Sequence, residues 1–360
     1  MQLGAAMLEA RRPLIVRLRN WVGDVVLSTP VLLRLQEQGH ELTLVGKGWA
    51  HELLAGFGWP VMRLGATHGE RVAQLAQWRR EVAQDRWGSP RSSNAISFPY
   101  SASSALEMRM AGLKAIGYDG EGRALLLHRS WPRPRLGRSG HELQVYWRLG
   151  QQLLGTDEAP PAALQWRVSA LHQGRAQALM QQHGLAPGFV MLCPFAGGTF
   201  EGQDKRWPHF EAYAQAAQQR STRPLVLCPG PGEEQEAARQ YPGTVILPGV
   251  DLGTCAALIQ QASVMVSNDT GPGHLAAAVG GPLVSVLGPT EPAHWGAWGP
   301  TVRVVRHWPR WPTVDEVWAA SQAHGPAEAA HTALGCNWPH GAAWCGARPQ
   351  LQGAHCSGVG

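Results

Sequence analysis

The chain has 360 residues, 44% of them hydrophobic, and a formal net charge of +5 at neutral pH. This composition can fill a large core and favours two domains, while the mild basic excess favours anionic partners such as phosphorylated substrates, nucleic acid or acidic lipid. No stretch approaches the roughly 18 apolar residues of a membrane span, and the first residues lack the features of a secretory signal, so the sequence predicts a cytoplasmic protein.

Apolar runs alternate with amphipathic helical patterns in the first part of the chain, which indicates βα units on a parallel sheet. Strands are predicted at 13–19, 41–46 and 94–98, and helices over 23–39, 70–86, 101–112 and 141–155. The segment 129–140 is basic and rich in Pro and Gly, so it is expected to be an exposed loop able to meet an anion. Residues 13–160 form the first predicted domain.

A Pro-rich segment, 156–166, is typical of an interdomain linker, and the alternation then begins again. Strands are predicted at 188–194, 224–230, 244–249, 264–269 and 282–289, and helices over 207–220, 252–262 and 273–280. Residues 170–320 form the second predicted domain. Two similar α/β domains place a ligand cleft between them, at the carboxyl ends of the strands.

The tail, residues 321–360, has no assigned role and holds half of the six cysteines. Cys193, Cys228 and Cys255 lie in or beside apolar runs, where we expect reduced core thiols. The tail combines the other three with two histidines: Cys336, Cys345, Cys356, His340 and His355. Their spacing matches no common zinc pattern, so a zinc site there is the alternative to a poorly ordered end.

The stretch "SNDTGPGHL" joins a predicted strand to an Ala-rich helix. Helix N-termini leave amide groups unpaired and carry partial positive charge, so Thr270, Gly271 and His274 are candidates for binding a phosphate. Asp269 either holds the turn or accepts a ligand hydroxyl. The competing interpretation is that Asp269 or Thr270 only caps the helix.

Two neighbouring strand ends carry further candidates. The Gly-rich segment 197–208 offers Thr199 and the cation of Lys205, although its spacing is not that of a Walker A motif, and the alternative is an ordinary solvated loop. Glu233, after the next strand, either accepts ribose hydroxyls or favours the start of a helix. Together the three strand ends suit a nucleoside diphosphate.

Four motifs in order, "NWVGDVVLSTP", "GGTFEGQDKRWP", "NDTGPGHLAAAVGGP" and "GPTEP", resemble the ADP-heptose:lipopolysaccharide heptosyltransferases, glycosyltransferase family 9. The resemblance runs from about residue 13 to 320. It implies an α/β protein of the GT-B fold, with two Rossmann-like domains facing a central cleft. The first domain would bind the lipopolysaccharide acceptor and the second the nucleotide sugar, and transfer would be inverting and independent of metal.

The resemblance also implies roles for single residues. Asp24 would be the general base on the acceptor hydroxyl, although a carboxylate there can also simply cap a helix. The donor side would use phosphate ligands, a ribose ligand, a backbone position near adenine and the phosphate-side turn: Thr199, Lys205, Glu233, Val250, Asp269, Thr270, Gly271 and His274. We find no Asp-x-Asp pair of the metal-dependent kind, so no metal or cofactor is expected beyond the ADP-sugar substrate.

The acceptor, the inner core of lipopolysaccharide, would be met by arginines at the inner face of the cytoplasmic membrane, where the protein would be peripheral. The candidates are Arg17, Arg19, Arg133 and Arg135. "NWVGD" favours the second heptosyltransferase type. Alternatives are another nucleotide sugar, a GT-B epimerase and a catalytically silent binding protein. Nucleic acid is not expected, because the arginines are scattered and the tryptophans form no stacking pattern.

Overall fold

The computed structural model describes residues 12–82, 92–137 and 140–323. The first half of this part contains six strands: β1 (Arg12–Arg17), β2 (His40–Gly46), β3 (Val61–Arg63), β4 (Ala95–Ser97), β5 (Ala115–Tyr118) and β6 (Arg129–Trp131). Its helices are α1 (Val22–Glu37), α2 (Ala50–Leu54), η1 (Ala55–Phe57), α3 (His68–Glu81), α4 (Ala102–Met110), η3 (Arg123–Leu125) and α5 (Glu142–Leu154).

The second half contains eight strands: β7 (Val190–Cys193), β8 (Thr199–Phe200), β9 (Gln203–Asp204), β10 (Leu225–Leu227), β11 (Val245–Ile246), β12 (Val264–Ser267), β13 (Leu283–Val286) and β14 (Val302–Val305). Its helices are α6 (Ala170–Gln182), α7 (Phe210–Arg220), α8 (Glu234–Gln240), α9 (Leu252–Ile259), α10 (Gly271–Ala278), α11 (Pro292–Trp295) and α12 (Val314–Gln322). None of these or the earlier helices is long and apolar enough to cross a bilayer.

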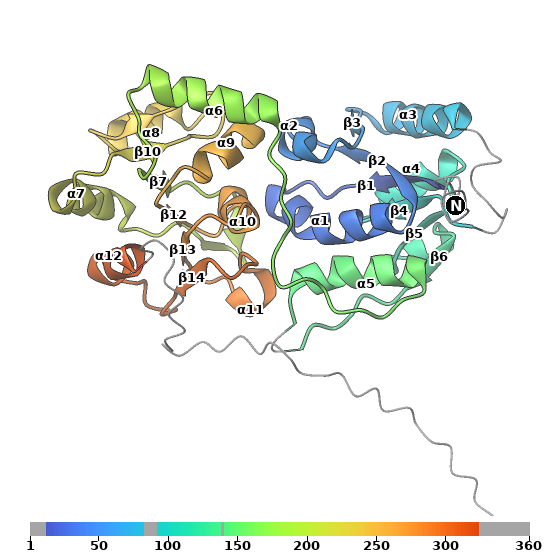
Figure 1. Cartoon of the computed structure of the whole chain (residues 1–360). Coiled ribbons are helices and arrows are strands. Elements are labelled where there is room, and N and C mark those ends of the chain that lie inside the picture. Colours follow the sequence, from blue (N-terminus) through green and yellow to red (C-terminus); the bar gives the residue numbers. More distant parts are fainter. Residues whose placement is uncertain (1–11, 83–91, 138–139, 324–360) are drawn as a thin grey trace, which may run out of the picture. The chain divides into compact units, whose positions relative to one another are not determined.

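Each half is built on one parallel sheet of six strands (Figure 1), in the orders β3-β2-β1-β4-β5-β6 and β11-β10-β7-β12-β13-β14. Counting strands within each half, and setting aside the β8–β9 hairpin, both orders are 3-2-1-4-5-6, the doubly wound arrangement of Rossmann folds. The chain reverses its winding direction beside β1 and beside β7. Loops at these two switch points therefore form the natural crevice for a ligand.

The predicted strands and helices are confirmed in position, with ends that differ by a few residues. The helix predicted over 70–86 ends at Glu81 in the described chain, and residues 83–86 lie outside it. The expectation of a loop over 129–140 is wrong at its start, because residues 129–131 pair with β5 as the edge strand β6. A three-residue edge strand buries too little to leave an alternating apolar pattern, which also explains the missed β3.

The Gly-rich segment before Lys205 is a hairpin and not an open loop. β8 and β9 pair antiparallel, with Thr199 opposite Asp204. The two residues of the turn, Glu201 and Gly202, have φ values of 50° and 78°. Positive φ at both positions is the geometry of the tight two-residue turn that suits the twist of a hairpin, and Gly202 adopts it without steric cost.

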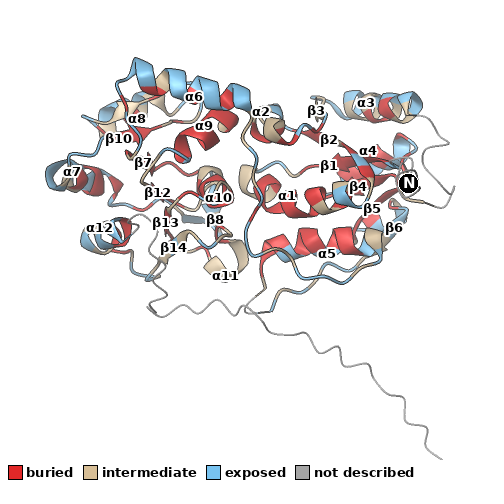
Figure 2. Ribbon diagram, in the orientation of Figure 1, coloured by how far each residue is buried: buried red, intermediate tan, exposed pale blue. Residues whose placement is uncertain are grey.

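The central strands of each sheet, such as β1, β12 and β13, are buried on both faces because helices cover each sheet on two sides (Figure 2). In β1, Ile15 faces a cluster with α3 and α4, while Leu14 and Val16 face α1 and α5. The cluster that contains Leu14 and Val16 extends beyond the first half. It continues through α9, α10 and the inner face of the second sheet, where it includes Met191 and Met265. One apolar core thus joins the two halves, which belong to one compact unit of the chain.

Helices α1 and α10 meet at their N-terminal ends, one from each half. A Cβ placed on Gly271 would lie 2.5 Å from Cβ of Val22, and one placed on Gly23 would lie 2.8 Å from Cδ2 of His274. Real Cβ atoms do not approach that closely, so both positions require the absence of a side chain. These glycines are selected by the close approach of the two helix ends.

We expect Gly271→Ala to lower the free energy of unfolding by about 1–3 kcal/mol, because the added methyl group overpacks the contact with Val22. Gly174→Ala is the matched control, since Gly174 lies on the exposed face of α6 with no atom within 4 Å of its Cβ position. That change should raise stability by about 0.5–1 kcal/mol through helix propensity. Urea titration of both variants measures the two effects, and a stable Gly271→Ala protein would contradict the packing argument.

Candidate functional site

A cavity of about 740 Å³ is lined by residues of both halves. On the first half the lining comes from the end of β1, the first turn of α1, and α2. On the second half it comes from the ends of β7, β10 and β12 with the turns that follow them. The sequence candidates that line it are Arg19, Asp24, Thr199, Lys205, Glu233, Val250, Asp269, Thr270, Gly271 and His274.

Asp24 lies in the first turn of α1 and interacts with other elements instead of capping its helix. Its Oδ1 accepts a hydrogen bond of 2.6 Å from the hydroxyl of Tyr146, on α5, and its Oδ2 lies 3.8 Å from Nε of Arg19. The N-cap position belongs to Trp21. The alternative that Asp24 serves as a cap is therefore wrong, and the carboxylate is positioned by long-range contacts at the cavity wall.

Tyr146 is 1% exposed, and burial together with the Asp24 carboxylate raises the pKa of its hydroxyl well above the usual value. The phenol is therefore protonated at neutral pH and donates to Asp24. Its ring packs edge-on against Phe98, with centroids 5.3 Å apart. Tyr146 is a residue that the sequence reasoning missed, since no local pattern links it to a carboxylate 122 positions away.

Lys205 and Asp269 form the charged centre of the opposite wall. Lys205 Nζ donates to the Asp269 carbonyl at 3.2 Å and lies 3.7 Å from Oδ2 of the same residue. Thr290 donates to that oxygen at 2.9 Å, and His274 Nε2 lies 3.7 Å from Oδ1. Burial acts to raise the pKa of Asp269, but hydrogen bonding and charge from His274 and Lys205 outweigh it, and the pKa is lowered. Asp269 is thus an anion that holds the lysine at the cavity.

The N-terminus of α10 opens between these groups. Thr270 occupies the N-cap position, yet its hydroxyl contacts Ser267 Oγ at 3.2 Å, and within the described residues it caps no helix amide. The first intrahelical bond is donated by His274 to the Thr270 carbonyl. The amides of Gly271 and Gly273 precede it, so they remain for a ligand. The alternative of a side-chain cap is wrong, and the geometry fits an anion.

The lining around the turn after β10 combines a carboxylate with apolar groups. Glu233 Oε2 accepts a 2.8 Å hydrogen bond from the Gly230 amide, which closes the turn after β10. Val250, Cys228 and Cys255 lie on the same lining. Burial raises the pKa of the nearby Cys193 thiol to about 11, so this sulfur is neutral and a poor nucleophile at neutral pH.

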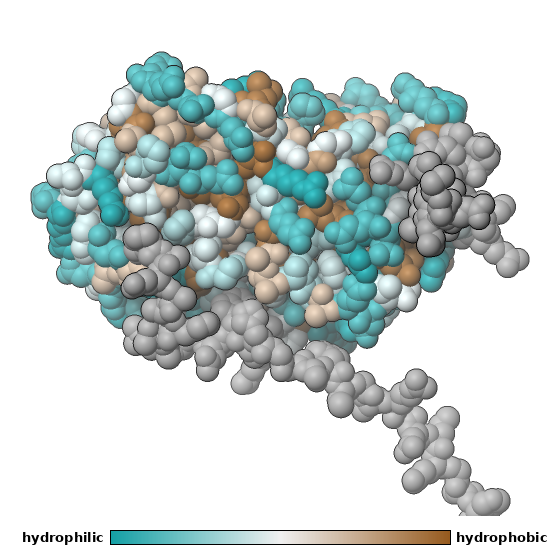
Figure 3. Space-filling view, in the orientation of Figure 1, coloured by the Kyte–Doolittle hydropathy of each residue, from teal (hydrophilic) through white to brown (hydrophobic). Residues whose placement is uncertain are grey.

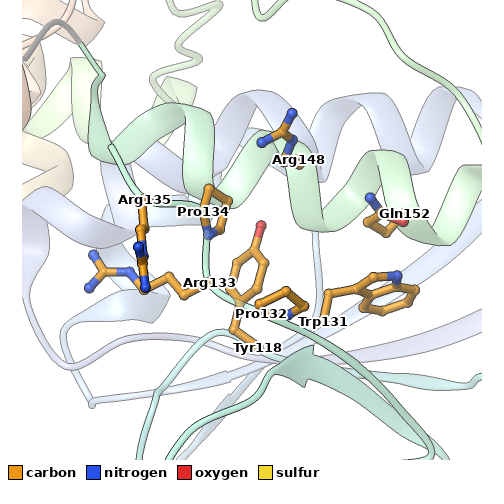
Figure 4. Close-up of a pocket in the computed structure, with 8 residues that line it drawn as sticks. All are labelled: Tyr118, Trp131, Pro132, Arg133, Pro134, Arg135, Arg148 and Gln152. Carbon is orange, nitrogen blue, oxygen red and sulfur yellow. The ribbon is translucent and has the colours of Figure 1, made fainter. Parts of the chain in front are cut away.

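The arginine candidates are divided among three places. Arg19 lines the cavity, whereas Arg17 is buried below it, 3.9 Å from Glu107. Arg133 and Arg135 line a second pocket of about 430 Å³ (Figure 4), where Arg148 projects from α5 above Tyr118. Arg133 also donates to the buried Glu142 at 2.7 Å. The structure therefore brings one predicted arginine, and not four, to the main cavity.

One group of side chains at the cavity resembles a metal site in its composition. Ligand atoms of Glu52, His172 and Asp251 lie within 4.8 Å of one another. However, Arg175 Nη1 lies 3.4 Å from Glu52 and 3.2 Å from Asp251, and its charge would oppose a cation. His172 already contacts Ser169 and Glu52 through its two ring nitrogens, both at 2.7 Å. The group fits an ion-pair cluster that joins α2 of the first half to α6 and α9 of the second.

His141 makes another contact between the halves. Its Nε2 lies 2.9 Å from the carbonyl of Gly296, and its Nδ1 accepts the Leu143 amide at 3.1 Å. An acceptor Nδ1 requires a neutral ring with the proton on Nε2, which then donates to Gly296. Burial lowers the pKa of His141 to about 4, in agreement with that state.

Comparison with known families and proteins agrees with this architecture. Residues 93–323 match the model of glycosyltransferase family 9 (heptosyltransferase). Lipopolysaccharide heptosyltransferase 2 of Escherichia coli strain K12 is 25% identical over 315 residues, which cover 80% of this chain and 86% of that protein. Lipooligosaccharide heptosyltransferase 2 of Haemophilus ducreyi is 27% identical over 303 residues, or 76% of this chain and 83% of that protein.

Solved structures extend the comparison to the fold. The E. coli ADP-heptose lipopolysaccharide heptosyltransferase II covers 87% of this chain and 98% of its own, with a TM-score of 0.69 and 23% identity. The E. coli heptosyltransferase WaaC, solved with ADP, covers 87% of this chain and all of its own, with a TM-score of 0.63 and 20% identity. The expected GT-B fold, with two Rossmann-like parts, is confirmed.

We expect the free energy of unfolding to fall as the pH is lowered from about 6.5 towards 4, because the unfolded chain binds a proton at His141 that the folded chain excludes. Once the pH is below the folded-state pKa of His141, the free energy of unfolding has lost about 3 kcal/mol from this residue. His40, whose pKa burial also lowers to about 4, acts in the same direction. Denaturant titrations across this range measure how steeply the free energy of unfolding falls with pH. His141→Asn should make this dependence weaker, and an unchanged dependence would contradict the neutral state assigned to His141.

Proposed function

The chain belongs to glycosyltransferase family 9 (heptosyltransferase), and from this premise we propose that it transfers heptose from ADP-heptose to the inner core of lipopolysaccharide, with inversion and without a metal ion. One observation carries the proposal. A carboxylate from the first half, Asp24, lines the same cavity as the Lys205 cation and the open N-terminus of α10 from the second half.

The second half supplies the chemistry that a nucleoside diphosphate needs. Lys205 and the Gly271 and Gly273 amides provide positive charge and donors for the diphosphate. Glu233 and Val250 lie on the part of the lining assigned to ribose and adenine. Asp269 keeps Lys205 in place before the donor arrives, so the charge that develops on the leaving ADP meets a group already oriented for it. A related heptosyltransferase solved with ADP supports this choice of nucleotide.

The first half supplies the base. Asp24 removes the proton of the acceptor hydroxyl as its oxygen bonds to the anomeric carbon of heptose, while the bond from that carbon to the ADP oxygen breaks. A single displacement of this kind inverts the anomeric centre. The neutral Cys193 thiol argues against a covalent cysteine intermediate, and Lys205 with the α10 amides stabilises the leaving group in place of a metal ion.

The acceptor proposal rests on the first half and on the relatives. Arg19 lies beside Asp24 and is available for an anionic group of the acceptor, while Arg133 and Arg135 lie around the second pocket and would contact a more distant part. The proteins of E. coli and H. ducreyi that align over 80% and 76% of the chain are of the heptosyltransferase 2 type, which supports an acceptor that already carries heptose. The mild basic excess is consistent with peripheral binding at the membrane that holds this acceptor.

Asp24→Asn should reduce turnover by a factor of about 10²–10⁴, because the amide cannot accept the acceptor proton, while donor affinity stays within about twofold. The measurement is mass analysis of truncated lipopolysaccharide after incubation with ADP-heptose, where the product is heavier by one heptose. Asp315→Asn, which removes an exposed carboxylate paired with Arg220, is the control and should remain active.

Parallel incubations with other nucleotide sugars test the donor. Product from one of these and none from ADP-heptose would replace the proposal with a family member of different donor specificity. Full activity of Asp24→Asn would remove the proposed base. Donor binding without turnover by the unmodified protein, with every acceptor supplied, would favour a catalytically silent binding protein.

Lys205→Met should weaken ADP binding by about 10- to 100-fold, because it removes the charge that faces the diphosphate and leaves Asp269 without its cation. Arg206→Gln is the matched control. Arg206 is the next residue, but it pairs with Glu236 at 3.7 Å and lies outside the cavity lining. Its loss should change affinity by less than about twofold. Calorimetric titration with ADP compares the two, and equal affinities would overturn the role of Lys205.

A further inference from the structure

We infer that Tyr146 is a positioning residue, which fixes the carboxylate of Asp24 in the orientation that accepts the acceptor proton. The inference rests on the proposed function, because it assigns Asp24 as the base. It adds a residue of α5 that neither the motifs nor the family resemblance pointed to. Tyr146 lies outside the cavity lining and so acts on the reaction only through Asp24.

Tyr146 is held rigidly behind Asp24, which lines the cavity. Tyr146 is almost fully buried, and its hydroxyl reaches Asp24 Oδ1 at 2.6 Å, a short distance typical of a bond to a charged oxygen. The edge-on contact with Phe98 restricts the ring. Gly150, one helical turn further along α5, lets this helix approach α1 so closely that a Cβ would lie 2.0 Å from Cγ2 of Val31. Backbone packing thus sets the distance between the phenol and Asp24.

The bond leaves the two carboxylate oxygens with different tasks. Oδ1 is engaged by Tyr146, so Oδ2 remains for the acceptor hydroxyl, with Nε of Arg19 3.8 Å away. Arg19 is itself fixed over the Tyr100 ring, at 4.3 Å from the centroid. Tyr100 donates to the buried Glu142 at 2.8 Å. Helix α5 therefore restrains both oxygens. Tyr146 bonds to Oδ1 directly, and Glu142 holds Tyr100, whose ring positions Arg19 near Oδ2.

A structural role alone would predict a different set of effects. A buried hydroxyl that only completes the packing contributes to stability and leaves kcat unchanged when removed. A hydroxyl that orients the base changes kcat with little effect on KM, because substrate binding does not depend on it.

The experiment compares Tyr146→Phe with Tyr213→Phe in the full chain, with Asp24→Asn as reference. Tyr213 is equally buried, but it donates to Ser321 at 3.1 Å, within the second half and outside the cavity lining. Each variant loses one buried hydrogen bond that a tyrosine hydroxyl donates. We expect kcat of Tyr146→Phe to fall about 10- to 100-fold with KM values within about twofold. Tyr213→Phe should keep the kcat and KM of the parent protein.

The outcomes separate this inference from the proposed function. If Asp24→Asn is inactive and Tyr146→Phe matches Tyr213→Phe in kcat, the positioning role is wrong and the proposed base stands. If Asp24→Asn retains turnover, the proposed base is wrong, and the positioning role of Tyr146 falls with it. Thermal unfolding of both phenylalanine variants is measured alongside. Should Tyr146→Phe fail to fold, Phe98→Leu, which keeps the Tyr146 hydroxyl but removes the edge-on contact that restricts its ring, is assayed, and an unchanged kcat would overturn the role.

Discussion

The close approach of the α1 and α10 N-termini is the constraint on which the site depends. Each helix end carries about half a positive charge, so two ends in contact repel each other unless anions lie nearby. Asp24 in the first turn of α1 and Asp269 before α10 supply that negative charge, and Gly23 and Gly271 remove the side chains that would keep the ends apart. Stability of the junction and the presence at the cavity of the carboxylate that we propose as the base therefore have the same origin.

The same junction explains how charge is divided across the cavity. Lys205 is paired with Asp269, and Asp269 accepts hydrogen bonds from Lys205 and Thr290 that do not depend on a ligand. The open amides at the start of α10 are the part of this wall that a phosphate can still use. On the other wall Asp24 is restrained by Tyr146 and Arg19. Both walls are thus organised in advance, which reduces the reorganisation required during reaction.

Contacts at the edge of the cavity and outside it determine how firmly the halves are joined. A shared apolar core, the ion pairs of Glu52 with α6, and the His141 bond to Gly296 all cross between them. The segment after α5 adds to these, because Trp298 donates to the Pro161 carbonyl at 3.0 Å. Elsewhere the face shown in Figure 3 is largely hydrophilic, with apolar residues in small separated groups.

The sequence by itself determined the two α/β halves and most of the cavity wall on the second half. Asp269 and Thr270 come just after β12, Glu233 lies in the turn after β10, and Lys205 lies in the segment that follows β7. The carboxyl ends of these parallel strands must meet at one edge of the sheet. Only the tertiary structure decided that Arg17 is buried against Glu107, that β6 completes the first sheet, and that Tyr146 supports Asp24. Periodicity and turn chemistry are local properties of the chain. A contact between residues 122 positions apart depends instead on how closely two helices pack, and no local pattern encodes that distance.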